Sequence, residues 1–221
     1  MSTIILTGIF AVSVLMGNAN VVNAEDSGNM SVYNNENIPM EQSITLVNQD
    51  TGDTFDIPVE AEVKEIPEIQ TRNSDGSTLY EATYVADIPD VTLLSGDSFN
   101  NISDTDGAIS YRVTARVTYR KNTIGQYLYL NFSGSFTKIS NDHISISNRG
   151  IDMGMSSKGN FIYLKNYKPT SNYFSYDTNM TKYYTIEAYT DQFGGAAYAT
   201  LTRAGGSTWG IICNNQIAPT M

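Results

Sequence analysis

Residues 111–120 read YRVTARVTYR, and this stretch decides the fold. Apolar side chains occupy the odd positions from Tyr111 to Tyr119, and arginine or threonine occupies the even positions from Arg112 to Arg120. Successive side chains of a β-strand point to opposite faces. An alternation of this length therefore predicts a strand with one face in a core and the other in water.

Further short runs on the C-terminal side of this stretch carry the same signal. A turn at 121–125 leads into residues 127–132, where Leu128, Leu130 and Phe132 alternate with polar or tyrosine positions. Other expected strands are residues 143–147, 161–164, 183–190, 196–203 and 208–213. No helical period of 3.6 accompanies them. Close spacing of short strands predicts an all-β fold, an antiparallel immunoglobulin-like β-sandwich of about seven strands over residues 107–221.

The charge of the chain divides at the start of this strand-rich region. Between Glu25 and Asp106 there are 18 acidic and two basic residues, whereas after Gly107 there are 11 basic and five acidic ones, for a net charge of −10. Sign asymmetry of this kind marks two segments with different roles. We expect some strands of the acidic segment to dock onto the basic domain, with Arg112, Arg116 and Arg120 as a contact face.

The acidic segment is predicted to be partly extended. Residues 25–42 are polar and without period, which predicts a disordered leader. Residues 43–106 form an acidic region with short strands: a hairpin of 44–47 and 54–57, followed by strands at 79–88 and 91–94. Prolines interrupt the runs between these strands.

The N-terminus predicts export. Residues 4–16 form an uncharged, mostly apolar run that is too short to span a bilayer, and Val22-Asn23-Ala24 precedes the acidic pair that begins at Glu25. Small residues at these positions are typical of signal-peptidase cleavage, so residues 1–24 are interpreted as a signal peptide. A basic residue before the apolar run is lacking. The expected location is extracellular, free or associated with the cell surface, with no stable membrane anchor after cleavage.

The residue types that carry most catalysis are scarce. The chain has one histidine, His143, and one cysteine, Cys213. Cys213 shares a strand face with Trp209 and Ile211, which predicts a core position, and it has no second cysteine for a disulfide. No catalytic residue, cofactor or metal site is expected, because no nucleophile–base pattern or metal-ligand spacing occurs.

Two alternative functions stay open at this stage. A secreted glycan-active hydrolase would need a pair of carboxylic acids, for which Glu187 and Asp191 are the candidates. A membrane-active toxin would use residues 111–136 as an amphipathic β-hairpin. Nucleic acid is disfavoured as a partner because the chain is acidic and carries an export signal.

Two groups of residues are binding candidates. The first is the arginine face, in which three guanidinium groups are spaced about 6.6–6.8 Å apart along one side of a strand. The second is a tyrosine-rich stretch, because tyrosine offers a flat amphipathic contact surface to a glycan or protein. The candidate residues are Arg112, Arg116, Arg120, Tyr173, Tyr176, Tyr183 and Tyr184.

Three short pieces of the chain, at residues 147–149, 169–176 and 203–209, carry a resemblance. Over roughly residues 107–215 the chain resembles uncharacterised small exported proteins of Gram-positive bacteria. The resemblance implies export and an all-β domain, and it carries over no catalytic residue. The expected function is that of an exported, non-enzymatic β-sandwich protein that binds a cell-wall polymer, a glycan or a protein.

Overall fold

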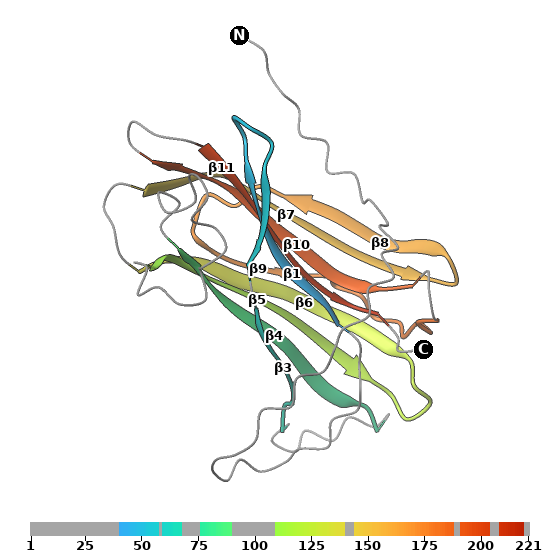
Figure 1. The fold of residues 1–221 in the computed structure, drawn as a ribbon. Coiled ribbons are helices and arrows are strands. Elements are labelled where there is room, and N and C mark those ends of the chain that lie inside the picture. Colours follow the sequence, from blue (N-terminus) through green and yellow to red (C-terminus); the bar gives the residue numbers. More distant parts are fainter. Residues whose placement is uncertain are drawn as a thin grey trace, which may run out of the picture. The chain divides into compact units, whose positions relative to one another are not determined.

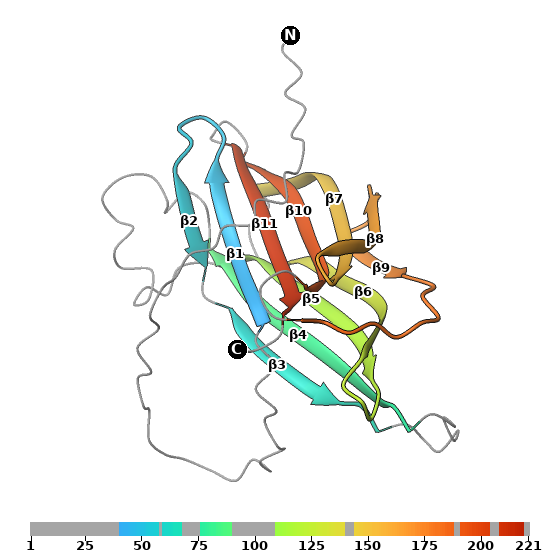
Figure 2. The same ribbon diagram turned by 90° about the vertical axis from the view of Figure 1, so that its right-hand side faces the viewer.

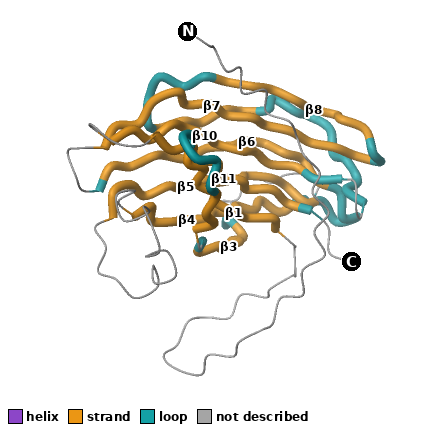
Figure 3. The backbone as a smooth tube through the Cα atoms, turned by 45° about the horizontal axis from the view of Figure 1, so that its top comes forward, coloured by secondary structure: helices purple, strands orange, loops and turns teal. Residues whose placement is uncertain are grey.

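Antiparallel strands account for all the regular secondary structure in the described part of the chain. The structure is a computed structural model and describes residues 40–57, 59–67, 76–89, 109–139, 144–187, 191–203 and 208–218. Within these residues there is no helix, so none of the described segments is a transmembrane helix (Figure 3). The eleven strands are β1 (Met40–Asn48), β2 (Thr54–Ile57), β3 (Glu60–Glu65), β4 (Thr78–Pro89), β5 (Ile109–Lys121), β6 (Tyr127–Lys138), β7 (Ile144–Ser157), β8 (Asn160–Tyr167), β9 (Tyr173–Asp177), β10 (Phe193–Arg203) and β11 (Thr208–Ile217). The all-β prediction is confirmed.

The strands form two sheets that pack face to face (Figures 1 and 2). One sheet has six strands in the order β2-β1-β11-β10-β7-β8, and the other has five in the order β3-β4-β5-β6-β9. Every neighbouring pair is antiparallel. The described strands therefore form an antiparallel β-sandwich, as the alternating sequence pattern predicts.

The acidic region contributes strands to both sheets. β4 pairs with β5 from Thr78 opposite Lys121 to Pro89 opposite Ile109, and β1 pairs with β11 along its whole length. These strands belong to the same compact unit as the later ones, Glu36–Met221. The docking of acidic strands onto the basic domain, expected from the charge division, is thus seen as ordinary sheet hydrogen bonding.

The core lies between the sheets and follows the alternation in β5. The odd-numbered residues of β5, from Tyr111 to Tyr119, are all buried. Glycines let large rings approach the facing or neighbouring strand: a Cβ on Gly195 would lie 2.8 Å from the ring of Phe132 in the other sheet. Trp209 packs on Phe55 of β2 at a ring-centroid distance of 5.5 Å. Strands from both halves of the sequence therefore fill one core.

A buried amide connects the two sheets. Asn215 of β11 is fully buried, and its Nδ2 donates to the backbone carbonyls of Ala82 in β4 at 3.1 Å and Ala115 in β5 at 2.9 Å. Alanine at both acceptor positions leaves space for the amide to reach the backbone. Because a buried polar group must find a partner, Asn215 fixes the position of one sheet above the other.

Several expected strands differ from the structure. A strand is expected over 183–190, but residues 183–187 hold a single bridge, between Tyr184 and Tyr127, and residues 188–190 lie outside the described residues. β3 and β9 were not expected from the sequence, and β1 begins at Met40, inside the leader expected over 25–42. The described residues do not include the strand expected at 91–94 or His143. They also do not include residues 1–39, which hold the predicted signal peptide and most of the predicted leader.

The alternation expected in residues 127–132 is interrupted by a bulge. The register between β5 and β6 shifts where Thr118 faces Asn131 and Tyr119 faces Tyr129. One extra residue in a strand moves all the following side chains to the opposite face. Tyr129 is consequently buried together with Phe132, although the sequence places the two residues on opposite faces.

The Asn215 contact can be tested by substitution. We expect Asn215→Ala to lower the free energy of unfolding by about 1–3 kcal/mol, because it leaves buried space and two carbonyls without their side-chain donor. The neighbouring Asn214→Ala is the control, since its amide is partly exposed and donates to the Ser43 hydroxyl at 3.4 Å. Urea unfolding measures both variants, and equal losses for the two would contradict the role assigned to Asn215.

Candidate functional site

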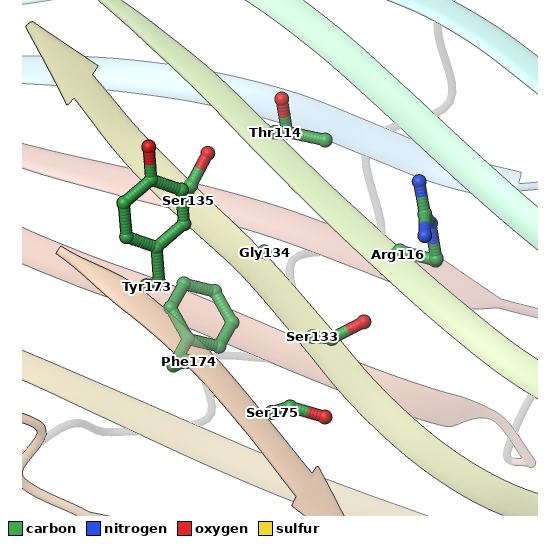
Figure 4. A pocket seen from close by; sticks show the side chains of 8 residues that line it. All are labelled: Thr114, Arg116, Ser133, Gly134, Ser135, Tyr173, Phe174 and Ser175. Atoms are coloured by element: carbon green, nitrogen blue, oxygen red, sulfur yellow. The ribbon is translucent and has the colours of Figure 1, made fainter. Parts of the chain in front are cut away.

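The candidate site is a shallow, open groove of about 460 Å³ on the outer face of the five-stranded sheet. It crosses three strands, β5, β6 and β9. Figure 4 shows Tyr173 and Arg116 on either side of the small residues of β6. The groove, called here the Tyr173 groove, is lined by Thr114, Arg116, Ser133, Gly134, Ser135, Tyr173, Phe174 and Ser175.

Strand register explains why these residues meet. Ser135 lies opposite Thr114 on one side and Tyr173 on the other, and Ser133 lies between Arg116 and Ser175. Two residues along a strand separate these rows, so both rows point to the same face of the sheet about 6.6–6.8 Å apart. The depression forms because the small hydroxyl side chains of β6 lie between the longer side chains of Arg116 and Tyr173.

The floor of the groove depends on Gly134. A Cβ at this position would lie 2.1 Å from the carbonyl oxygen of Thr114 and 2.7 Å from the ring of Phe174. Phe174 is buried and contacts Phe132 and Phe136 at centroid distances of 5.6 and 6.1 Å. Gly134 belongs to the core-facing row of β6, so the Phe174 ring packs directly against its backbone, and the outer side of that backbone forms the floor of the groove.

Contacts of three residues, Asn172, Phe174 and Tyr176, hold β9 so that Tyr173 faces solvent. Phe174 anchors the strand in the core, and Tyr176 stacks on Tyr167 of β8 at 3.9 Å with an interplanar angle of 12°. The residue before β9, Asn172, accepts a hydrogen bond from Arg149 of β7 and its carbonyl accepts from Phe136 N–H at 2.9 Å. Tyr173 is 67% exposed, so its ring is available to a ligand on a supported strand.

The arginine face is used mainly within the protein. Arg112 forms a bidentate ion pair with Asp87 of β4 at 2.7 and 2.9 Å. Arg116 lies 3.1 Å from Glu81 of β4 and also lines the groove. The expected contact between this face and the acidic region is therefore present for these two arginines. Arg120 is partly buried, lies opposite Leu79 and Leu128, and is not part of the groove.

The tyrosine candidates are separated by the fold. Tyr173 lines the groove, whereas Tyr176 is committed to the stack on Tyr167. Tyr184 exchanges two backbone hydrogen bonds of 2.8 Å with Tyr127 and packs against the core. Tyr183 is partly buried and lies outside the groove lining. Of the seven binding candidates, the fold brings Arg116 and Tyr173 together in the groove.

The groove residues that sequence reasoning missed are mostly small. Ser133, Ser135 and Ser175 carry little signal in isolation, because serine is common on any solvent-facing strand. An available signal was the alternation in YFSYD at residues 173–177, which places Phe174 and Tyr176 on one face and Tyr173 on the other. Recognition of β9 would have put Tyr173 beside the outer face of β6.

Buried titratable groups elsewhere have structural roles. Asp191 is buried, and its carboxylate accepts the backbone N–H groups of Lys158 at 2.7 Å, Gly159 at 2.8 Å and Glu187 at 2.9 Å. Burial raises the pKa of the Cys213 thiol to about 12, so the thiol is not reactive at neutral pH. Among the described residues no group of three His, Cys, Asp or Glu side chains could hold a metal ion.

Comparison with known proteins adds no relative. No protein-family model, no curated protein and no solved structure matches this chain.

The Arg112–Asp87 pair makes a pH-dependent contribution that can be measured. The Arg112 hydrogen bond holds the pKa of Asp87 below its ordinary value of 3.8. The ionised pair therefore stabilises the fold above that pH, and the contribution is lost as the pH falls through the lowered pKa of the folded state. Because both side chains are partly exposed, we expect a coupling energy of only about 0.2–1 kcal/mol at pH 7.

A double-mutant cycle of Asp87→Asn and Arg112→Gln, followed by urea unfolding at several pH values, measures this coupling. It should shrink below pH 3.8 and vanish when Asp87 is protonated in the folded protein as well. A coupling that stays constant down to low pH would show that the contact is not an ion pair.

Proposed function

We propose that this chain is an exported, non-enzymatic β-sandwich protein that binds an extracellular glycan in the Tyr173 groove. The observation that carries the proposal is the placement of an exposed tyrosine and an arginine on either side of a strip of serine and threonine hydroxyls. These groups come from three strands of a sheet, so the recognition surface needs little ordering on binding.

The chemistry of the groove suits a sugar chain. A sugar presents hydroxyl groups around its edge and C–H groups on its faces. Ser133, Ser135 and Ser175 can donate to and accept from such hydroxyls. The Tyr173 ring provides an apolar face on which a sugar ring can stack while its own hydroxyl stays in water. Arg116 is paired with Glu81, and its guanidinium adds N–H donors that can reach the hydroxyl or carboxylate oxygens of a glycan.

The finer fold assignment is also a proposal. In immunoglobulin folds one sheet holds strands A, B, E and D, the other holds C, F and G, and variable-type domains add C′ beside C. With β5 as A, the order β5-β6-β9 corresponds to A-B-E, and β11-β10-β7-β8 corresponds to G-F-C-C′. The proposed immunoglobulin-like unit is then β5–β11, extended by β3-β4 on one sheet and by β1-β2 on the other.

Export and surface association are inferred from the sequence. The apolar run and cleavage pattern at residues 1–24, together with the resemblance of residues 107–215 to exported Gram-positive proteins, support this location. The proposed partner is a polymer of the cell wall or surface. A protein ligand at the groove is the alternative if the chain retains no glycan.

Neither alternative function gains an observation in its favour. The Asp191 carboxylate is occupied by three backbone donors, and Glu187 is exposed, so these two residues do not form a pair facing a cleft. The β5–β6 hairpin of the toxin hypothesis lies between β4 and β9 with one face in the core. Membrane insertion of that hairpin would require both neighbouring strands to detach.

Binding to purified cell-wall polysaccharide and to a glycan array tests the proposal. We expect Tyr173→Ala to weaken binding about 5–30-fold, because it removes the stacking surface, and Ser133→Phe to abolish it by filling the groove. Phe161→Ala is the matched control, since Phe161 is 70% exposed but lies on β8, outside the groove. Failure of the wild-type chain to retain any glycan, or equal retention by all three variants, would overturn the proposal.

A further inference from the structure

The two edges of the six-stranded sheet carry opposite charge. β2 forms one edge and β8 the other. Residues 43–57, which include β2 and the turn before it, contain Asp50, Asp53 and Asp56 and no basic residue. Residues 158–168, which include β8, contain Lys158, Lys165 and Lys168 and no acidic residue. These six side chains are exposed, so the charge division of the sequence becomes a charge difference across the sheet.

The basic edge also exposes apolar side chains. Phe161, Leu164 and Ile162 of β8 are 70%, 49% and 37% exposed. β8 is eight residues long, and β7 is its one neighbour in the described sheet. An edge strand presents a row of backbone N–H and C=O groups that can pair with another strand, and apolar side chains strengthen such pairing.

The strand directions permit one copy of the protein to continue the sheet of another. The six strands alternate in direction from β2 to β8, so these two edge strands run in opposite directions. If the β2 edge of a second copy is placed beside β8 of the first, with the copy turned to follow the twist of the sheet, its β2 runs antiparallel to β8. The antiparallel order then continues across the contact.

Pairing of β8 with the β8 strand of another copy is disfavoured. It would bring three lysines of one copy close to the same three lysines of the other. Lys165 lies opposite Met153, on the row of β7 that faces the core, and a bulge occurs near Met155. A lysine on an edge strand and a bulge are features that protect the strand from unselective pairing. The occupant of this edge must therefore supply carboxylates, as the β2 edge does.

We propose that copies of this protein associate head to tail, with the basic β8 edge of one copy against the acidic β2 edge of the next. A head-to-tail contact uses two different surfaces and extends into a ring or a filament. β2 has only four residues, so the contact is short and the association is weak and sensitive to salt. The contact leaves the outer face of the five-stranded sheet, and with it the Tyr173 groove, accessible in every copy.

Sedimentation velocity of the full chain over a range of protein concentrations, at low and high salt, tests the proposal. At low salt the sedimentation coefficient should rise with protein concentration. We expect the association constant to fall at least about tenfold when the salt is raised to 0.5 M, because exposed charge pairs are screened. Lys165→Glu/Lys168→Glu and Asp53→Lys/Asp56→Lys should each abolish association on their own. An equimolar mixture of the two should restore it with alternating copies, because every contact then pairs an acidic edge with a basic one.

The decisive variant combines all four substitutions. It exchanges the charges of the two edges, so head-to-tail association should return to at least about one third of the wild-type constant. Lys138→Glu on β6 is the control for a change in net charge, and circular dichroism checks that each variant is folded. A wild-type chain that stays monomeric at low salt would overturn the proposal. Association that survives Asp53→Lys/Asp56→Lys would also overturn it, because it would indicate β8–β8 pairing.

Discussion

The pairing of β4 with β5 is the interaction on which the rest of the structure depends. β5 has a buried face and a polar face, and a strand of this kind is stable only inside a sheet. β6 supplies one neighbour through a short turn, and β4, from the acidic region, supplies the other. Without β4 the backbone edge of β5 would be exposed, and Tyr84, Ala82 and Ile88 would be missing from the core.

Ion pairs connect β4 and β5, but they contribute little to the free energy of this pairing. Arg112–Asp87 and Arg116–Glu81 lie on the outer face, where water screens them, and exposed ion pairs are worth about 0–1 kcal/mol. Burial of the apolar side chains and the continuous backbone hydrogen bonds stabilise the sheet far more. The acidic residues outside these pairs have another consequence, because β1–β2 and β8 form opposite edges of the six-stranded sheet. The charge division of the chain becomes a division of its surface.

The groove results from the way the core packs beneath it. Phe174 needs space above β6, and Gly134 provides it. The serines on either side of Gly134 face solvent and are small. The outer face therefore has a depression at the place where Phe174 fills the core. The same strand, β9, contributes Phe174 to the core and Tyr173 to the groove. A change in the core at this point would therefore alter the candidate binding surface.

The sequence by itself determined the class of fold and much of its strand list. The alternation in residues 111–120 was sufficient to predict β5, because a two-residue period needs no knowledge of neighbours, and Cys213 was correctly placed in the core by its strand face. The charge division predicted that the acidic region docks, and Arg112 and Arg116 make that contact. The candidate site was predicted only as two unconnected residues, Arg116 and Tyr173.

Only the tertiary structure decided which strands are neighbours and which side chains share a surface. The bulge near Tyr119 places Tyr129 in the core, and no local pattern reveals a register shift that depends on the partner strand. β9 is short and is held by rings of other strands, such as Tyr167 of β8, so its existence depends on distant contacts. The residues that line the groove are spread between positions 114 and 175 of the sequence, and sheet register alone brings them together. The local period of apolar residues can be seen in the sequence itself. Strand register and packing cannot, because they depend on contacts between segments that are distant in the sequence.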